Sequence, residues 1–167
     1  MKKTLIYIIL AIAGLLACKS NQPSTKDTTK QSSTTKESSK EKEIVKIARS
    51  YVGVKYQYGG VSNKGVDCSG LSHLVYKDAG IILPRISQEQ SKFGKRVYIG
   101  ELRKGDLIFF GAKPGSKKIT HIGIVSYFNN GYIKMIHASS SKGVREDVVD
   151  DVYWRQRYIK ASRPLSI

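Results

Sequence analysis

Cysteine is scarce in this chain of 167 residues, which has only Cys18 and Cys68. Two thiols cannot build a disulfide-knit miniprotein or a four-thiolate zinc site. Long hydrophobic runs are scarce too: one apolar stretch lies near the N-terminus and none follows, which excludes a polytopic membrane protein. The sequence has no internal repeat, and its length suits one domain with or without a tail.

The first residues have the pattern of an export signal. Lys2 and Lys3 precede the apolar stretch 5–16, which is short for a membrane span. The stretch ends in Ala17-Cys18, and a small residue followed by Cys here resembles a bacterial lipobox. We therefore expect residues 1–17 to be a signal peptide and Cys18 to be the lipidated N-terminus of a membrane-anchored protein. Ordinary cleavage that leaves Cys18 as a free thiol is the alternative.

The segment 18–43 has a different composition from the rest of the chain. After Cys18 it contains no aromatic or aliphatic residue and is mostly Ser, Thr, Lys, Gln and Glu. Such a segment cannot bury apolar surface, so we expect a disordered tether. Lys rather than Asp at position 19 favours the outer membrane of a two-membrane cell, with the domain 44–167 in the periplasm.

Acidic residues are few, 13 against 29 Lys and Arg, for a net charge of +16. From Ile44 onward, 21 basic and nine acidic residues leave +12. An exported protein does not meet nucleic acid, so the charge favours anionic wall polymers, lipid headgroups or carboxylate-bearing substrates. A basic surface that serves only solubility is the alternative.

The hydrophobic spacing predicts helices first and strands afterwards. Apolar residues recur every three or four positions over about 42–52 and 68–79. Ser87 and Gln90 have the spacing of a capping box, which predicts a short helix from Ser87 toward Gly94. Asn129-Asn130-Gly131 predicts a hairpin turn. The predicted strands are 107–110, 121–128, 132–138, 144–149 and 157–161. This order predicts an α+β domain in which helices pack on an antiparallel sheet.

Cys68 is a candidate nucleophile because a glycine-containing loop becomes a helix at this residue. Backbone N–H groups and the helix dipole there favour a thiolate. An unpaired cysteine in an exported protein suggests nucleophilic catalysis. A small buried core residue is the alternative.

His121 and His137 are the candidate partners of this thiol. His121 opens a predicted strand, where a neutral imidazole can accept the thiol proton, and His137 lies on the partner strand of the hairpin. Together with Cys68 they predict a Cys–His–His triad. A zinc site of the same residues is the alternative, although the short ligand spacing of zinc motifs is missing. His73 falls off the apolar stripe of its helix, so we expect it to be solvated.

The motifs match a known family in order and spacing. From about Ile44 to Pro164, the chain resembles the NlpC-type cell-wall cysteine peptidases, which have a papain-like fold. The matching segments are Tyr56-Gln57-Tyr58-Gly59-Gly60, Asp67-Cys68-Ser69-Gly70-Leu71, Leu83-Pro84-Arg85, Gly105-Asp106-Leu107-Ile108-Phe109-Phe110, His121-Ile122-Gly123-Ile124-Val125 and Ile136-His137-Ala138.

The resemblance implies that Cys68 is the nucleophile, His121 the base and His137 the residue that orients the base. It also implies that Tyr56 lies near the oxyanion site, where its hydroxyl would help to stabilise developing charge beside a backbone N–H group. No metal or organic cofactor is implied.

The resemblance further implies substrate contacts for Asp67, Ser69 and Arg85. Ile86 departs from the family pattern, which usually has Ser or Thr there. The implied substrate is the stem peptide of peptidoglycan, cut either after D-glutamate or at the crosslink between stems. Two other functions stay open: a non-catalytic wall-binding lipoprotein, and a thiol acyltransferase or lipid hydrolase on a related fold. We expect a monomer.

Overall fold

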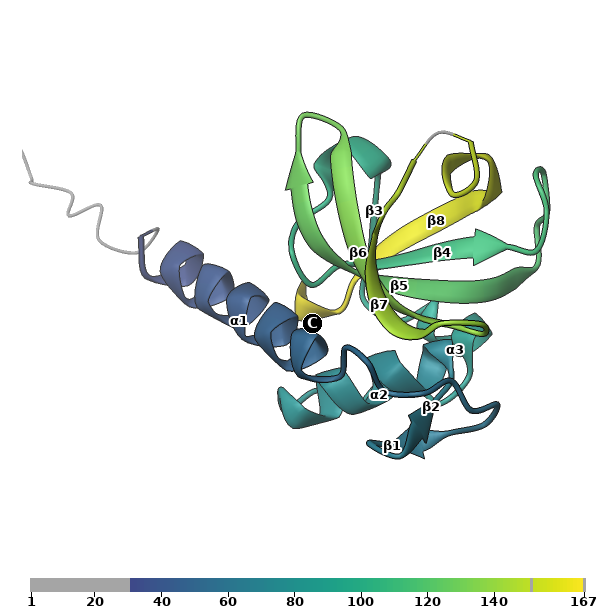
Figure 1. Ribbon diagram of the computed structural model, residues 1–167. Helices are drawn as coiled ribbons and strands as arrows, with labels where there is room; N and C mark the ends of the chain where they lie inside the picture. The colour runs from purple at the N-terminus through teal and green to yellow at the C-terminus, as the bar shows by residue number, and fades with distance from the viewer. Residues whose placement is uncertain (1–30, 151, 167) are drawn as a thin grey trace, which may run out of the picture.

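The computed structural model describes residues 31–150 and 152–166. It confirms the predicted α+β fold, with helices packed against one antiparallel sheet (Figure 1). The helices are α1 (Gln31–Ser50), α2 (Cys68–Asp78) and α3 (Ser87–Gln90). The strands are β1 (Val61–Ser62), β2 (Gly65–Val66), β3 (Lys95–Val97), β4 (Leu107–Gly111), β5 (Ile119–Asn129), β6 (Tyr132–Ser139), β7 (Gly143–Val148) and β8 (Tyr158–Arg163). Short 3₁₀ turns follow β3, precede β8 and close the described chain.

The main sheet has six strands in the order β3-β8-β4-β5-β6-β7, and each neighbouring pair is antiparallel. The five strands predicted from β-branched and aromatic residues are β4 to β8. Asn130 and Gly131 have φ of 46° and 82°, so both occupy the left-handed region that a tight hairpin turn requires. This turn joins β5 to β6 and places the two predicted site histidines on neighbouring strands.

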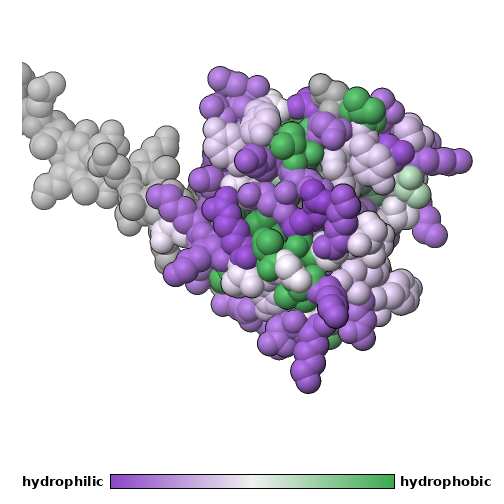
Figure 2. Space-filling view, in the orientation of Figure 1, coloured by the Kyte–Doolittle hydropathy of each residue, from purple (hydrophilic) through white to green (hydrophobic). Residues whose placement is uncertain are grey.

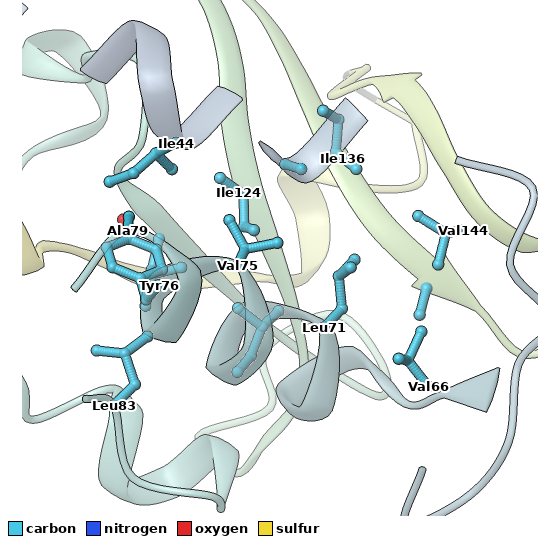
Figure 3. Packing of buried hydrophobic residues seen from close by; sticks show 14 of the residues in the cluster. Ile44, Val66, Leu71, Val75, Tyr76, Ala79, Leu83, Ile124, Ile136 and Val144 are labelled. Atoms are coloured by element: carbon cyan, nitrogen blue, oxygen red, sulfur yellow. The ribbon is translucent and has the colours of Figure 1, made fainter. Parts of the chain in front are cut away.

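Side-chain alternation divides the sheet into two buried faces. Ile124 and Ile136, which are paired across β5 and β6, point toward the helices and pack with α2 residues such as Leu71 and Val75 (Figure 3). The next pair, Val125 and Met135, points to the opposite face and belongs to a second apolar cluster. The first cluster fixes α2, and therefore its first residue, against β5 and β6.

Helix α1 begins earlier than predicted. It starts at Gln31 rather than near residue 42, so residues 31–43 are helical where we expected a disordered tether. Residues 31–52 contain neither Pro nor Gly, and Lys40 and Glu43 form an ion pair of 2.9 Å one turn apart. Local helix propensity thus extends α1 toward the N-terminus. Only the C-terminal part of the helix, from Ile44, packs into the core.

The predicted signal peptide 1–17, the lipidated Cys18 and the rest of the tether lie outside the described residues. Within residues 31–150 and 152–166, no helix is both long and apolar enough to cross a membrane.

Helix α3 is shorter than predicted and ends at Gln90. The predicted capping box is wrong: the N-cap is Ile86, whose side chain makes no capping bond, and Gln90 is buried instead of reaching back to the helix start. The amide of Gln90 donates to the carbonyl oxygens of Pro84 and Ser69, at 2.7 and 2.9 Å. Gln90 therefore ties α3 to the beginning of α2.

Hydrophilic side chains cover most of the face shown in Figure 2, including the part of α1 that joins the domain. A depression of about 230 Å³ beside α1 is lined by Lys42, Val45, Lys46, Arg49 and Lys104. The basic residues counted in the sequence thus gather beside α1 as well as in the cleft described next.

Candidate active site

A cleft of about 530 Å³ contains the four residues predicted to carry the chemistry, Tyr56, Cys68, His121 and His137. They come from the loop before β1, the start of α2, and strands β5 and β6. The other lining residues are Gly111, Ala112, Thr120, Ala138, Ser139, Ser140, Ser141, Lys142, Arg145, Asp147, Asp150, Tyr153, Trp154 and Arg157. Tyr56 and His137 are 81 positions apart in the sequence, and the fold places both in this cleft.

Cys68 is the first residue of α2, and it is the free cysteine of the described residues. Its Sγ lies 4.0 Å from the carbonyl oxygen of Thr120, and the backbone N–H of Ile122 donates to the sulfur. These two backbone groups flank His121. The thiol is thus held against the stretch of β5 that carries the predicted base.

Asp67 caps the helix that carries the thiol. Its backbone is extended (φ −95°, ψ 179°), and its carboxylate accepts a hydrogen bond of 2.6 Å from the N–H of Gly70. Gly70 itself packs so closely on the carbonyl oxygen of Gly60 that a Cβ would clash with it. The geometry of the helix start therefore accounts for Asp67 and Gly70 in the local sequence Asp-Cys-Ser-Gly.

The substrate contacts expected for Asp67, Ser69 and Arg85 stay a prediction, and the structure shows these three side chains bonded to one another. Arg85 donates to both carboxylate oxygens of Asp67, at 3.0 and 2.7 Å, and to Ser69 Oγ at 2.8 Å. Asp67 and Ser69 are buried, and none of the three is among the residues that line the cleft. Their polar groups are engaged inside the fold, where they hold the start of α2.

The electrostatics of the thiol also differ from the prediction. Burial raises the pKa of Cys68, and the charge of Asp67 raises it further. Backbone N–H groups of Ile122, Ser69 and Cys68 itself lower the pKa, but they do not outweigh desolvation. Cys68 is therefore a protonated thiol near pH 7 rather than the thiolate that a helix start alone would favour.

The two histidines are hydrogen-bonded to each other, as the hairpin predicted. His121 Nε2 lies 2.9 Å from His137 Nδ1, and the two rings meet edge to face. Desolvation, followed by the neighbouring His137, lowers the pKa of His121 to about 3. Desolvation also lowers the pKa of His137, against the opposing effect of Asp147. Both imidazoles are therefore neutral near pH 7, and His121 is free to accept a proton.

Three cleft residues were missed from the sequence: Trp154, Asp147 and Arg145. The Trp154 ring stacks on His121 at 5.3 Å between centroids and meets His137 edge to face at 5.0 Å. Asp147 accepts from His137 Nε2 at 3.0 Å. The sequence contained one indication, because a buried histidine that orients another needs a partner for its second nitrogen.

Tyr56 lies in the cleft with its phenol protonated. Desolvation raises its pKa, and the nearby Cys68 and Asp67 raise it further. A neutral hydroxyl can donate a hydrogen bond, as an oxyanion contact requires.

His73 is not solvated as expected. It is half-buried, and its Nδ1 lies 2.7 Å from the carbonyl oxygen of Leu83, away from the cleft-lining residues. Among residues 31–150 and 152–166, no group of three or more His, Cys, Asp or Glu side chains is arranged to hold a metal ion. His121 and His137 instead direct one ring nitrogen each toward the other, Nε2 and Nδ1, and share a hydrogen bond.

A thiol at the start of a helix beside a histidine chain on an antiparallel sheet defines a papain-like cysteine-nucleophile site. The profile of the NlpC/P60 family matches residues 53–163. The chain belongs to this family.

Relatives and solved structures agree with this assignment. The chain is 38% identical over 116 residues to the "Probable endopeptidase NlpC" of Escherichia coli (strain K12), covering 69% of this chain and 72% of that protein. It is 40% identical over 115 residues to the "Murein DD-endopeptidase MepS/Murein LD-carboxypeptidase" of the same strain, covering 68% and 57%. A crystal structure of an NlpC/P60 family protein from Bacillus cereus ATCC 10987 superposes with a TM-score of 0.68 at 32% identity, covering 75% of this chain and 40% of that one. The chain thus spans from two fifths to about seven tenths of these proteins.

Proposed function

We propose that this protein is a cysteine endopeptidase that hydrolyses peptide bonds in the stem peptides of peptidoglycan. One observation carries the proposal: the Cys68 thiol is packed on the β5 backbone that flanks His121, and His121 is hydrogen-bonded to His137 in the same cleft. This arrangement supports the proposed roles of Cys68 as nucleophile, His121 as base and His137 as the residue that orients the base.

The first half of the reaction forms an acyl-enzyme. His121 takes the proton of the Cys68 thiol as Sγ attacks the carbonyl carbon of the scissile bond, which gives a tetrahedral oxyanion. The backbone N–H of Cys68 and the hydroxyl of Tyr56 are the donors proposed for this oxyanion. When the intermediate collapses, the proton passes from His121 to the leaving amine, and the acyl group remains on sulfur as a thioester.

The second half releases the acyl group. Water gives a proton to His121 and attacks the thioester carbon, and the new carboxylic acid departs as the proton returns to sulfur. The resting state is a neutral thiol beside a neutral imidazole, so proton transfer and attack are coupled. No permanent Cys–His ion pair is needed in this scheme.

The cleft chemistry favours a peptide over an acyl chain. Lys142, Arg145 and Arg157 line it together with Asp147, Asp150 and the serines at positions 139–141, so the wall is mainly polar and its charged side chains leave a net positive charge. Stem peptides bear carboxylates, which such a wall attracts. The relatives described as endopeptidase and murein DD-endopeptidase support the same substrate class. The cleavage products distinguish a scissile bond after D-glutamate from one that crosslinks two stems.

The test is mass spectrometry of purified peptidoglycan and of defined muropeptide monomers and crosslinked dimers after incubation with the full chain. Loss of dimers identifies a crosslink-cutting endopeptidase, and release of a dipeptide identifies a stem-trimming one. Cys68→Ala is expected to remove all turnover, because no other group replaces the sulfur nucleophile.

His121→Asn and His73→Asn form the matched pair of controls. Both change one histidine, but only His121 lies in the cleft, so His73→Asn should keep most activity. Cleavage by Cys68→Ala at the wild-type rate would contradict the proposal. Binding of wall fragments without cleavage would support the wall-binding alternative, and release of fatty acid from phospholipid vesicles would support the lipid-hydrolase alternative.

We also propose that the protein is a monomer anchored to a membrane through lipidated Cys18, in the cell envelope and facing the periplasm from the outer membrane. The lipobox-like Leu16-Ala17-Cys18 and the apolar stretch before it support this. Metabolic labelling with palmitate should mark the wild-type chain and not Cys18→Ala. Sucrose-gradient fractions should contain the labelled chain with the outer membrane.

A further inference from the structure

Strand pairing places three polar side chains of β6 and β7 on one face of the sheet. His137 lies directly opposite Arg145 in the antiparallel register, and Asp147 is two residues further along β7. Residues two apart on a strand point to the same side, so Arg145 and Asp147 both accompany His137. Glu146, between them, points to the other face, where it pairs with Arg49 at 3.1 Å.

The side chains form one continuous chain of hydrogen bonds. His121 Nε2 meets His137 Nδ1 at 2.9 Å, and His137 Nε2 meets Asp147 Oδ2 at 3.0 Å. The other carboxylate oxygen, Oδ1, accepts from Arg145 Nε at 2.6 Å. Each nitrogen of His137 and each oxygen of Asp147 therefore has a partner.

This chain has a direction, because an ionised carboxylate only accepts hydrogen bonds. The proton between His137 and Asp147 must then be on His137 Nε2. A neutral imidazole has one N–H, so Nδ1 of His137 is an acceptor, and the proton between the rings must be on His121 Nε2. Nδ1 of His121 is left without a proton, as a base requires.

The direction is not fixed by the two histidines alone. Two neutral imidazoles can share a hydrogen bond either way, with the donor on His121 or on His137. In the reverse arrangement His121 carries its proton on Nδ1 and accepts through Nε2, so Nδ1 is no longer basic. A group beyond His137 that only accepts distinguishes the two arrangements, and Asp147 is such a group.

We propose that Asp147, held by Arg145, is a positioning residue of the catalytic centre, which fixes the tautomers of His137 and His121 so that His121 Nδ1 is the base. This inference rests on the proposed function for its kinetic consequence, while the tautomers themselves can be observed without substrate.

The charges around the pair support this role. Desolvation by itself raises the pKa of Asp147, but the hydrogen bonds and charges of His137 and Arg145 outweigh it, so the pKa is lowered and the carboxylate stays ionised. When His121 accepts the thiol proton, its positive charge lies one imidazole away from this carboxylate. Asp147 thus also stabilises the imidazolium that forms.

Other charged and titratable groups face the same cleft: the Cys68 thiol from α2, the Tyr56 phenol, Lys142 from the β6–β7 loop, and Asp150 and Arg157 after β7. Asp150 accepts instead from the backbone N–H of Tyr153, at 2.8 Å. In this cleft, the carboxylate of Asp147 is hydrogen-bonded to a site histidine, His137.

The test compares Asp147→Ala and Asp147→Asn with Glu146→Gln in the full chain. Glu146→Gln is the matched control, since it removes a carboxylate and an arginine pair from the same strand without touching the histidines. Ring ¹⁵N NMR of histidine-labelled protein reports which nitrogen of each imidazole is protonated, and muropeptide turnover gives kcat and KM.

We expect wild type and Glu146→Gln to show Nε2–H on both His121 and His137. Asp147→Ala should show mixed tautomers and a kcat that falls roughly 10- to 100-fold with KM nearly unchanged. Asp147→Asn should fall at least as far, because its amide can donate to His137 and reverse the chain. Asn has nearly the same shape as Asp, so this variant still tests the role if the alanine variant fails to fold.

Unchanged tautomers in both Asp147 variants would overturn the inference, and so would a loss of activity that appears only in KM. If wild type cleaves muropeptides while the tautomers do not respond, the proposed function stands and the positioning role fails. If the tautomers respond but no chain cleaves muropeptides, the positioning role stands and the proposed substrate fails.

Discussion

Two aspartate–arginine ion pairs lie beside the two halves of the site, the helix α2 side and the sheet side, and the two pairs have different roles. On the helix side, Asp67 pairs with Arg85 and precedes the thiol. On the sheet side, Asp147 pairs with Arg145 and follows the histidines. The ion pairs themselves are alike, with short contacts of 2.7 and 2.6 Å.

The difference lies in what else each carboxylate accepts. Asp67 accepts hydrogen bonds from the backbone N–H groups of Gly59 and Gly70, at 2.9 and 2.6 Å, so its charge holds a loop and a helix start. Asp147 accepts a hydrogen bond from a ring nitrogen of His137, so its charge acts on a group that can exchange protons. The comparison teaches that a carboxylate's partners decide whether an ion pair supports the fold or the chemistry.

The largest expected effect is on stability, and it separates the two pairs. Asp67→Ala removes a helix cap and leaves Arg85 without its carboxylate, so we expect the free energy of unfolding to fall by about 2–4 kcal/mol. Asp147→Ala should cost only about 1 kcal/mol, the value of one hydrogen bond at a partly exposed site. Urea denaturation followed by circular dichroism measures both. Asp67→Asn, which keeps a capping oxygen, should lie between them, and equal losses for the two alanine variants would contradict the comparison.

A smaller effect is expected from Trp154, which belongs to the sheet side. Its ring stacks on His121, and an aromatic face stabilises the imidazolium formed during catalysis. Trp154→Ala should therefore lower kcat about 3- to 30-fold, and Trp154→Phe should lose less. Steady-state turnover of a muropeptide measures this. Tyr132→Ala, on the β5–β6 hairpin, is the control and should keep its kcat; an unchanged kcat in Trp154→Ala would show that the stacking is only packing.

The smallest expected effect concerns the pKa of the Cys68 thiol, at the start of α2 on the helix side of the site. Burial and the charge of Asp67 raise the pKa of Cys68, so alkylation by iodoacetamide should be slow near pH 7 and should accelerate above the ordinary thiol range. Asp67→Asn removes the charge that raises this pKa, so its rate profile should move to lower pH. Asp147→Asn, which changes the sheet side, should leave the profile in place. A wild-type midpoint below that of a free thiol would contradict the raised pKa.

Much of the site could be predicted from local sequence patterns. Cys68 follows a glycine-containing loop at the start of an amphipathic helix, and His121 and His137 flank an Asn-Gly turn, so each position is set by a few neighbours in the chain. Trp154 and Asp147 could not be predicted in this way. Asp147 stands in Arg145-Glu146-Asp147, which resembles a charged surface segment, and only the β6–β7 register brings it to His137.

What the local patterns missed has physical reasons as well. Asp67, Ser69 and Arg85 belong to motifs near Cys68, but only the packed structure shows that Arg85 donates hydrogen bonds to both Asp67 and Ser69. The tether was expected to be disordered because it has no apolar residue, yet a segment without Pro or Gly can continue a helix that is anchored at one end.

Local sequence patterns were sufficient to predict the elements and the candidate chemistry: the change of period from helix to strand, the helix that begins at Cys68 and the hairpin that pairs the histidines. These depend on backbone geometry and side-chain alternation, which short segments carry within themselves. The protonation of the site, in contrast, depends on how the packed elements surround each group. The raised pKa of the thiol, the neutral histidines and the direction of their hydrogen bonds depend on desolvation and charge supplied by remote segments, and these act only once the helix and the sheet are packed together.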